Sequence, residues 1–269
     1  MAEAGMSERR IRLEDGRRMF VSESARKEGL PVLFLNSLAA DHSMWEAVRH
    51  RLERRTVAFD ARGHGQSDVV PGDGTLADYA ADVLRVMDAT GLERAVLCGL
   101  SLGGLTAMQV AADAPERVAG LVLANTAVSF PPATMWQERA AQARGGQWGE
   151  LVEPTLERWL TQGYRSAEPQ TATAVRTMLE GMPAEGYAAA CSVLAMADAT
   201  QALTSWDGPA MIIAGAQDQS TPVARAEEMS ALVPQAELVV LDAAHVSAIE
   251  RAEEFAAALE RFVARVERD

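Results

Sequence analysis

The sequence has few cysteines, no long apolar run, and fewer basic than acidic residues. Two of its 269 residues are cysteines, Cys98 and Cys191, and neither belongs to a CxxC motif or a Cys/His cluster. This scarcity argues against a disulfide-stabilised scaffold and a structural zinc site, and it favours a reducing compartment. No stretch approaches the roughly 18 consecutive apolar residues of a membrane span, and the N-terminal segment is charged where a signal peptide would be apolar. We therefore expect a soluble, cytoplasmic protein.

The excess of acidic residues excludes two classes of partner. The chain has 38 aspartates and glutamates against 25 lysines and arginines, which gives a formal net charge of -13. A charge of this sign repels nucleic-acid phosphates and anionic lipid, so we expect neither nucleic acid nor a membrane surface as a partner. A small molecule is the expected partner, and no pattern in the sequence indicates an oligomeric state.

Short apolar runs alternate with amphipathic stretches along most of the chain. Segments 11–13 and 18–21 flank Asp15-Gly16 and predict an opening hairpin. The apolar runs that predict further strands are residues 32–36, 56–59, 95–99, 120–124, 210–215 and 237–241. Apolar residues at helical spacing predict helices at 44–52, 76–90, 102–113, 223–232 and 250–266. This alternation predicts an α/β fold, with a mostly parallel sheet and helices on both of its faces.

The alternation stops between residues 130 and 201. This segment contains no convincing strand, and glycines and prolines separate several short helical stretches. We interpret residues 130–201 as a helical cap inserted between two strands of a core made of residues 1–129 and 202–269. The large side chains of the cap, among them Trp136, Trp148 and Trp159, are expected to form its own small core.

A candidate nucleophile lies at the end of one predicted strand. Residues 99–103 read Gly-Leu-Ser-Leu-Gly and match the G-x-S-x-G pattern, with Ser101 between a strand and a helix. In such a turn the serine backbone is strained and its hydroxyl projects above the sheet, while the glycines allow helix and strand to approach closely. The alternative is a serine that only caps the helix.

A serine hydroxyl needs a base within hydrogen-bond reach, and the chain has four histidines. His50 ends a charged helix and His42 precedes the first crossover helix, so solvation and capping account for them. His64 and His245 both follow predicted strands, where sites form in open α/β sheets.

The base in turn needs a carboxylate that orients it. Asp218 directly follows the strand at 210–215, and the order Ser101, Asp218, His245 is the one found in α/β-hydrolases. This order favours His245 over His64. Asp242 is the main alternative acid, and Asp60 is a weaker one.

An oxyanion produced by attack on a carbonyl needs two backbone N–H donors. One is expected from Leu102, the residue after the nucleophile, and the other from Leu38, in the loop after the strand at 32–36. Hydrolysis of an ester or lactone by these groups needs no metal and no organic cofactor.

Beyond these groups, the chain resembles the 3-oxoadipate enol-lactonases of the α/β-hydrolase superfamily, from about residue 32 to residue 262. The loop after the strand at 32–36 carries Asn36-Ser37 where most relatives have His-Gly. The further matching segments are 41–45 (DHSMW), 60–67 (DARGHGQS, shared by very many α/β-hydrolases), 114–118 (APERV), 121–126 (LVLANT), 157–159 (ERW), 185–187 (EGY) and 242–247 (DAAHVS).

The resemblance implies an enzyme that opens 3-oxoadipate enol-lactone through an acyl-enzyme, with Ser101, Asp218 and His245 as its catalytic triad. It also implies that Trp136 and Arg139, on the first cap helix, bind the carboxylate of the lactone. A guanidinium is suited to that task because its planar set of donors matches a carboxylate.

The sequence departs from the family at two places beside the expected site. Leu38-Ala39-Ala40 lacks the glycine that usually follows Asn-Ser-Leu, and Ala248 stands where the lactonases tend to have asparagine. Neither departure removes a catalytic group, so they bear on the identity of the substrate more than on the hydrolase chemistry. The alternatives are a carboxylesterase or a hydrolase of another lactone or biosynthetic intermediate, and, from a different class, a non-catalytic ligand-binding protein of the same fold.

Overall fold

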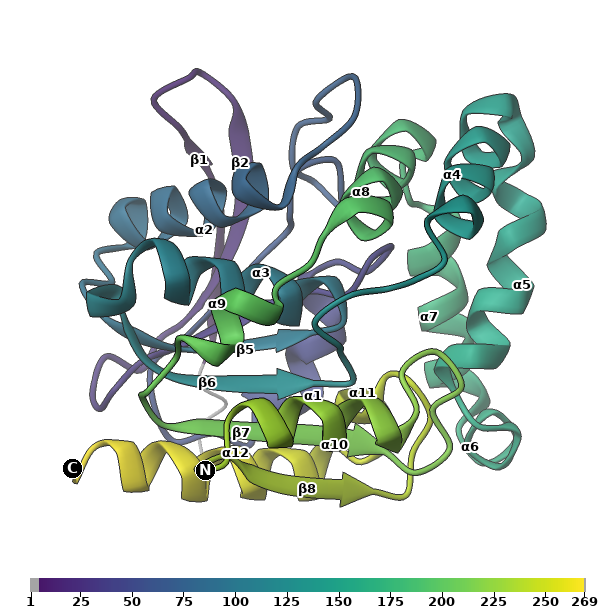
Figure 1. Cartoon of the computed structure of the whole chain (residues 1–269). Coiled ribbons are helices and arrows are strands. Elements are labelled where there is room, and N and C mark those ends of the chain that lie inside the picture. Colours follow the sequence, from purple (N-terminus) through teal and green to yellow (C-terminus); the bar gives the residue numbers. More distant parts are fainter. Residues whose placement is uncertain (1–4, 269) are drawn as a thin grey trace.

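This computed structural model describes residues 5–268 of the chain. They contain one eight-stranded sheet (Figure 1). The strands found in that part are β1 Met6–Arg12, β2 Arg18–Ser24, β3 Val32–Leu35, β4 Thr56–Phe59, β5 Ala95–Leu100, β6 Val118–Ala124, β7 Ala210–Gly215 and β8 Glu237–Leu241. Their order across the sheet is β1-β2-β4-β3-β5-β6-β7-β8. The neighbouring pairs β4-β3, β3-β5, β5-β6, β6-β7 and β7-β8 are parallel, whereas β2 is antiparallel to both β1 and β4. The predicted, mostly parallel sheet is confirmed.

The predicted opening hairpin is also confirmed and is longer than expected. Its two strands, β1 and β2, have seven residues each. Gly16 in the connecting turn has φ 86°, a conformation that glycine adopts without steric cost.

The order of the strands reverses at β3. This strand lies between β4 and β5, so the chain leaves β3 toward one edge of the sheet and returns on its other side. In a parallel sheet such a reversal opens a crevice beyond the carboxyl ends of the strands, where ligands commonly bind. The loop that contains Leu38 follows β3, and Ser101 follows β5, so both lie at this crevice.

Helices cover both faces of the sheet. On one face α2 Leu76–Thr90, α3 Leu102–Asp113, α9 Thr200–Thr204 and α10 Val223–Leu232 pack in succession, and on the other face lie α1 Glu46–Arg49, α11 Ser247–Glu250 and α12 Ala252–Val266. Every residue of β3 to β7 is buried between these layers, as their continuous apolar runs predict. In the described residues we find no helix that combines the length and apolar character needed to cross a bilayer.

Two predicted helices have different bounds in the structure. The helix predicted at 44–52 is a 3₁₀ turn, η1 His42–Trp45, followed by the short α1, because the Asp41 carboxylate accepts a hydrogen bond from the Ser43 N–H and starts the helical turn earlier. The helix predicted at 250–266 is interrupted at Arg251. There the Glu250 side chain packs toward the cap and the loop after β8, a long-range contact that periodicity does not reveal.

The segment between β6 and β7 is helical, and before α9 it contains α4 Ala133–Gln142, the π-helical segment η3 Ala143–Gln147, α5 Trp148–Trp159, α6 Gln162–Ala167, α7 Pro169–Glu180 and α8 Ala184–Met196. We refer to these helices as the cap; its division from the core at residues 130 and 201 stays a prediction. Figure 1 shows them beyond the arrowheads of β5 to β8, over the carboxyl ends of these strands. Trp148 belongs to the cap's own core, since its indole N–H donates to the Leu179 carbonyl at 2.9 Å and its ring lies 4.3 Å from that of Tyr187.

The close packing of α3 on the sheet generates a first prediction. A Cβ at Gly103 in α3 would collide with the backbone carbonyl of Leu35 in β3. We expect Gly103→Ala to lower the free energy of unfolding by roughly 2–4 kcal/mol, because neither backbone can move away without disturbing the sheet. Denaturant unfolding measures the loss.

The matched control is Gly149→Ala in α5, where an added Cβ would meet no atom within 4 Å. This variant should be as stable as the wild type or slightly more stable, since alanine favours helix. Equal stability of the two alanine variants would contradict the proposed close approach of α3 and β3.

Candidate active site

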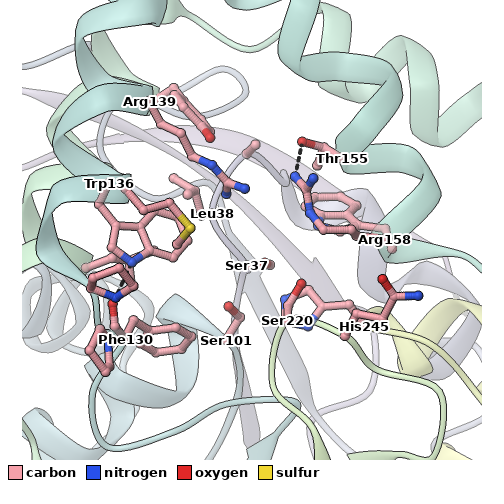
Figure 2. Close-up of a pocket in the computed structure, with 18 residues that line it drawn as sticks. Ser37, Leu38, Ser101, Phe130, Trp136, Arg139, Thr155, Arg158, Ser220 and His245 are labelled. Atoms are coloured by element: carbon pink, nitrogen blue, oxygen red, sulfur yellow. Dashed lines mark hydrogen bonds between the residues drawn. The ribbon is translucent and has the colours of Figure 1, made fainter.

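Ser101 lies in a strained turn between β5 and α3. Its backbone has φ 56° and ψ -114°, and a positive φ costs a non-glycine residue about 1–2 kcal/mol. The Ser101 carbonyl accepts hydrogen bonds from the N–H of Gly104 at 2.9 Å, the N–H of Leu105 at 3.1 Å and the hydroxyl of Thr126 at 2.7 Å. These bonds hold the turn, and the serine side chain lines a cavity above the sheet (Figure 2).

His245 follows β8 and lines the same cavity as Ser101. Its Nδ1 lies 2.9 Å from Oδ2 of Asp218, which follows β7, and both side chains are almost completely buried. Because Nδ1 donates its proton to the carboxylate, Nε2 is left as the basic nitrogen. Of the three residues that the sequence indicated, His245 and Asp218 are in contact, and Ser101 and His245 line one cavity. A buried carboxylate behind a histidine is the arrangement that prepares a hydroxyl for nucleophilic attack.

Asp218 has several further hydrogen-bond donors. Its Oδ1 accepts from the N–H groups of Ser220 at 2.8 Å and Thr221 at 3.0 Å, and its Oδ2 accepts from the Thr221 hydroxyl at 2.6 Å and the Asn125 amide at 3.0 Å. Burial by itself raises the pKa of this carboxyl, but the charge of His245 and these hydrogen bonds outweigh burial and lower the pKa to about 2. Asp218 is therefore ionised at neutral pH and can stabilise a protonated His245.

Neither alternative acid faces His245. Asp242 is exposed, and its carboxylate pairs with Arg251 at 3.2 Å. Asp60 is buried, and its Oδ1 lies 2.8 Å from both the backbone nitrogen and Nδ1 of His42.

The other three histidines do not line the cavity. His64 is fully buried, its Nδ1 lies 2.9 Å from the Arg62 carbonyl oxygen, and burial lowers its pKa. His50 is exposed at the end of α1, and His42 contacts Asp60. Topology left His64 open as a base, and the structure places it away from Ser101's cavity.

Among residues 5–268, one cluster of side chains has the types and spacing of metal ligands. Asp41, His42 and Asp60 have ligand atoms within 4.8 Å of one another. The two oxygens of Asp60 already accept hydrogen bonds at 2.8 Å from the N–H groups of His42 and Gln66, and Asp41 accepts from Ser43. These bonds account for the cluster, and we infer no metal site from it.

The two expected oxyanion donors lie on either side of the crevice. Leu102 is the first residue of α3, and the first N–H groups of a helix have no acceptor within that helix. Leu38 lies in a tight turn in which the Ala40 N–H donates to the Ser37 carbonyl at 3.1 Å. Asn36 connects the start of this loop to β4, because its side-chain amide nitrogen donates to the Phe59 carbonyl at 2.8 Å. The loop position is therefore fixed before any ligand binds, as preorganised donors require.

The cavity has a volume of about 290 Å³ and lies between the sheet and the cap. Ser101 and His245 lie at its floor in Figure 2, and Trp136, Arg139, Thr155 and Arg158 face them from the cap. Its walls are completed by Ser37, Leu38, Ala39, Phe130, Pro131, Pro132, Met135, Trp159, Tyr187, Leu194, Gln219 and Ser220.

Trp136 and Arg139, the expected carboxylate ligands, both line this cavity from α4. The indole N–H of Trp136 donates to the Phe130 carbonyl at 2.7 Å, and the Arg139 guanidinium lies 5.0 Å from the centre of the Trp136 ring. The tryptophan therefore supports the arginine through its ring face. Contact of either residue with a substrate carboxylate stays a prediction.

The two departures from the enol-lactonase pattern lie in different surroundings. Ala39 lines the cavity and has φ 68°, the left-handed conformation that a glycine at this position would adopt without strain. Ala248 is completely buried in α11 and does not line the cavity. Of the two, only Ala39 alters the wall that a substrate would meet.

Sequence reasoning missed two residues of the site. Asn125, at the end of β6, donates to Asp218 and to the Ala244 carbonyl, and its own oxygen accepts from the Ser247 hydroxyl at 2.5 Å. Arg158, on α5, lines the cavity opposite Ser101. Both lie inside segments that resemble the enol-lactonases, 121–126 and 157–159. This resemblance was the feature of the sequence that could have indicated a role for them in the site.

Comparison with known proteins agrees with this geometry. The profile of the alpha/beta hydrolase fold family matches residues 31–252. A 3-oxoadipate enol-lactonase of Acinetobacter baylyi is 34% identical over 254 residues, which cover 94% of this chain and 95% of that protein. The crystal structure of the enol-lactonase from Burkholderia xenovorans has a TM-score of 0.91 at 31% identity. The match covers 95% of this chain and 100% of that one. A thermophilic esterase from Thermogutta terrifontis, solved with malate bound, has a TM-score of 0.90 at 29% identity, over 97% of this chain and 99% of the esterase.

The contacts of Asn125 generate the next prediction. Replacing it by alanine removes one hydrogen bond to an ionised, buried carboxylate, so Asp218 and with it His245 become less well oriented. We expect kcat for p-nitrophenyl acetate to fall about 10- to 100-fold, with little change in KM, because Asn125 does not line the cavity.

The control for Asn125→Ala is Asn125→Gly, because the backbone here has φ 41°, which favours glycine. Both variants should lose the same activity. If glycine restores the wild-type rate, backbone strain in the alanine variant explains the loss, and the amide has no positioning role.

Proposed function

Because the chain belongs to the α/β-hydrolase family and groups there with the 3-oxoadipate enol-lactonases, we propose that it hydrolyses 3-oxoadipate enol-lactone to 3-oxoadipate. The observation that carries this proposal is the composition of one cavity. Ser101 and His245, with Asp218 behind them, lie at its floor, and the Arg139 guanidinium faces them from the cap. Such a cavity suits a small molecule with a reactive carbonyl at one end and a carboxylate at the other.

In the first half of the proposed reaction, Ser101 Oγ attacks the lactone carbonyl while His245 Nε2 accepts the hydroxyl proton. The new oxyanion receives hydrogen bonds from the N–H groups of Leu38 and Leu102. The carbonyl then re-forms as the bond to the ring oxygen breaks. This oxygen leaves as an enolate and takes the proton back from His245, which gives an acyl-enzyme that still carries the substrate's carboxylate.

In the second half, the enol becomes a ketone, and His245 removes a proton from a water molecule that attacks the acyl carbonyl. The same two N–H groups stabilise the second oxyanion. Ser101 then leaves with the proton from His245, and 3-oxoadipate is released. Throughout, the ionised Asp218 keeps His245 in one orientation and stabilises it when protonated.

Arg139 binds the carboxylate of the substrate in this proposal, with Trp136 as the ring that supports its guanidinium. A cation is needed at this place because the chain as a whole carries a charge of -13, which opposes an anionic substrate. The similar esterase from Thermogutta terrifontis was solved with malate, a small carboxylate, bound.

A carboxylesterase is the second candidate function. It is favoured by the similarity to that esterase, whose TM-score of 0.90 almost equals the 0.91 of the enol-lactonase. Steady-state hydrolysis of 3-oxoadipate enol-lactone beside p-nitrophenyl acetate distinguishes the two. A far higher kcat/KM for the enol-lactone supports the lactonase, and cleavage of the neutral ester alone supports the esterase.

Ser101→Ala tests the assignment of the nucleophile. The variant lacks the hydroxyl that forms the acyl-enzyme, so kcat on either substrate should fall by about 10⁴-fold or more. Its circular dichroism and thermal unfolding should match the wild type, which shows that the loss is chemical. Turnover close to the wild-type level would refute Ser101 as the nucleophile.

Arg139→Gln tests the carboxylate contact. We compare 3-oxoadipate enol-lactone with α-angelica lactone, which has the same enol-lactone ring but a methyl group in place of the carboxymethyl group. The variant should raise KM for the carboxylated lactone about 10- to 100-fold and change the kinetics of the neutral lactone little. Equal losses on both lactones would count against a carboxylate contact.

A further inference from the structure

The cavity contains a second guanidinium besides that of Arg139. Arg158 lies on α5, Arg139 lies on α4, and both side chains line the cavity from the cap side. In Figure 2 the two guanidinium groups project toward the same space above Ser101 and His245. Two cations from different helices therefore converge on one part of the cavity.

The described residues provide no ion-pair partner for either arginine. Their neighbours in the cap are paired, namely Arg144 with Glu185, Arg165 with Glu157 and Arg176 with Glu153. The protein partners of the two cavity arginines are neutral: Arg158 Nη2 donates to the Thr155 hydroxyl at 3.0 Å, and Arg139 stacks on Trp136. Although the chain has 38 acidic residues, neither of these two half-buried arginines is paired with a carboxylate.

This arrangement costs free energy as long as no anion lies between the two groups. Burial, and after it the positive charge of Arg139, lowers the pKa of Arg158, so the surroundings disfavour its charged form. An anion held between the two guanidinium groups would replace the water lost on burial and offset their repulsion.

We propose that Arg158 and Arg139 together bind the carboxylate of the substrate, as a two-arginine clamp. This inference rests on the proposed function and deepens it by assigning substrate selection to a second residue. The clamp holds the acid group at the cap, away from Ser101 and His245, and so directs the opposite end of the molecule, the ring carbonyl, to the floor. The hydrogen bond to Thr155 keeps the Arg158 guanidinium in place before the substrate arrives.

The clamp predicts that the substrate is a small lactone or ester with a carboxylate at the end opposite the scissile bond. A guanidinium donates two parallel hydrogen bonds to a carboxylate, so the two arginines can satisfy both of its oxygens. The neutral analogue loses these bonds and leaves both cations unpaired. Arg158 is thus a specificity-determining residue.

The first experiment measures kcat and KM of Arg158→Gln, Arg139→Gln and the double variant on 3-oxoadipate enol-lactone and on α-angelica lactone. Each single variant should lower kcat/KM for the carboxylated lactone about 10- to 100-fold, mainly through KM. The neutral lactone should change by less than about threefold. The double variant should lose less than the product of the single losses, because both residues bind one carboxylate. Multiplying losses would indicate two separate anion sites.

Two further variants serve as controls for Arg158→Gln. Arg176→Gln removes the same charge from the cap but belongs to a residue paired with Glu153 and outside the cavity, so it should leave the ratio of the two lactones unchanged. Arg158→Lys keeps the charge and loses the planar pair of donors, so its effect should lie between wild type and Arg158→Gln. The lysine variant also replaces the glutamine variant in the test if the latter does not fold.

Calorimetric titration with adipate separates this inference from the proposed reaction, because it needs no turnover. Arg158→Gln should weaken adipate binding about tenfold or more, and Arg176→Gln should not. If the wild type hydrolyses neither lactone but adipate binding depends on Arg158, the proposed reaction fails and the clamp stands.

The clamp is overturned if Arg158→Gln affects both lactones equally. Where neither lactone is hydrolysed, it is overturned if the wild type binds no adipate or if the variant binds adipate equally well.

Discussion

The positive φ of Ser101 is the constraint on which the rest of the site depends. A left-handed serine costs about 1–2 kcal/mol, and it persists because the hydrogen bonds to its carbonyl from α3 and from Thr126 hold the turn from two sides. The turn also requires β5, β3 and α3 to approach so closely that Gly103 has no room for a side chain. The same close approach brings the loop of Leu38 and the first N–H of α3 to the two sides of the serine. The strain at Ser101, the packing of α3 and the positions of the two expected oxyanion donors therefore follow from one piece of backbone geometry.

A second constraint is the buried charge of Asp218. Burial alone raises the pKa of this carboxyl, and donors from several loops lower it again, with Asn125 after β6, Thr221 after β7 and His245 after β8. Asn125 also bonds the Ala244 carbonyl and Ser247, so one amide joins the loops that carry the acid and the base. The network holds His245 through its Nδ1, and the imidazole lines the cavity on its other side. The polar groups here are buried but satisfied, which is the condition under which such a network stabilises a unique arrangement.

Much of this molecule could be predicted from local patterns, and the remainder depends on contacts between distant segments. Continuous apolar runs identified the central strands because burial on both faces removes the alternation of polar residues. The order of serine, acid and histidine along the chain favoured His245 over His64. It could not separate Asp218 from Asp242, since both follow a strand and lie between Ser101 and His245; the contact of Asp218 with His245 makes that distinction. Periodicity failed at Arg251, where Glu250 interrupts a helix to bond the N–H groups of Thr161 and Ala244. It also could not identify Arg158, because an arginine on an amphipathic helix has the same pattern whether it faces solvent or a cavity.

The contrast between the charge of the whole chain and that of its cavity has a consequence for the proposed reaction. The net charge of -13 acts over a distance limited to about 8 Å by physiological salt, whereas the two cap arginines act at contact in a half-buried space. A monoanionic lactone can therefore be held locally although the surface repels it. The proposed hydrolysis would then create a second carboxylate at the floor, on the side of the ionised Asp218. In the proposed reaction, the cap arginines attract the carboxylate that the substrate already carries, and Asp218 repels the second carboxylate that hydrolysis adds. The same charge distribution would therefore bind the substrate and favour release of the product.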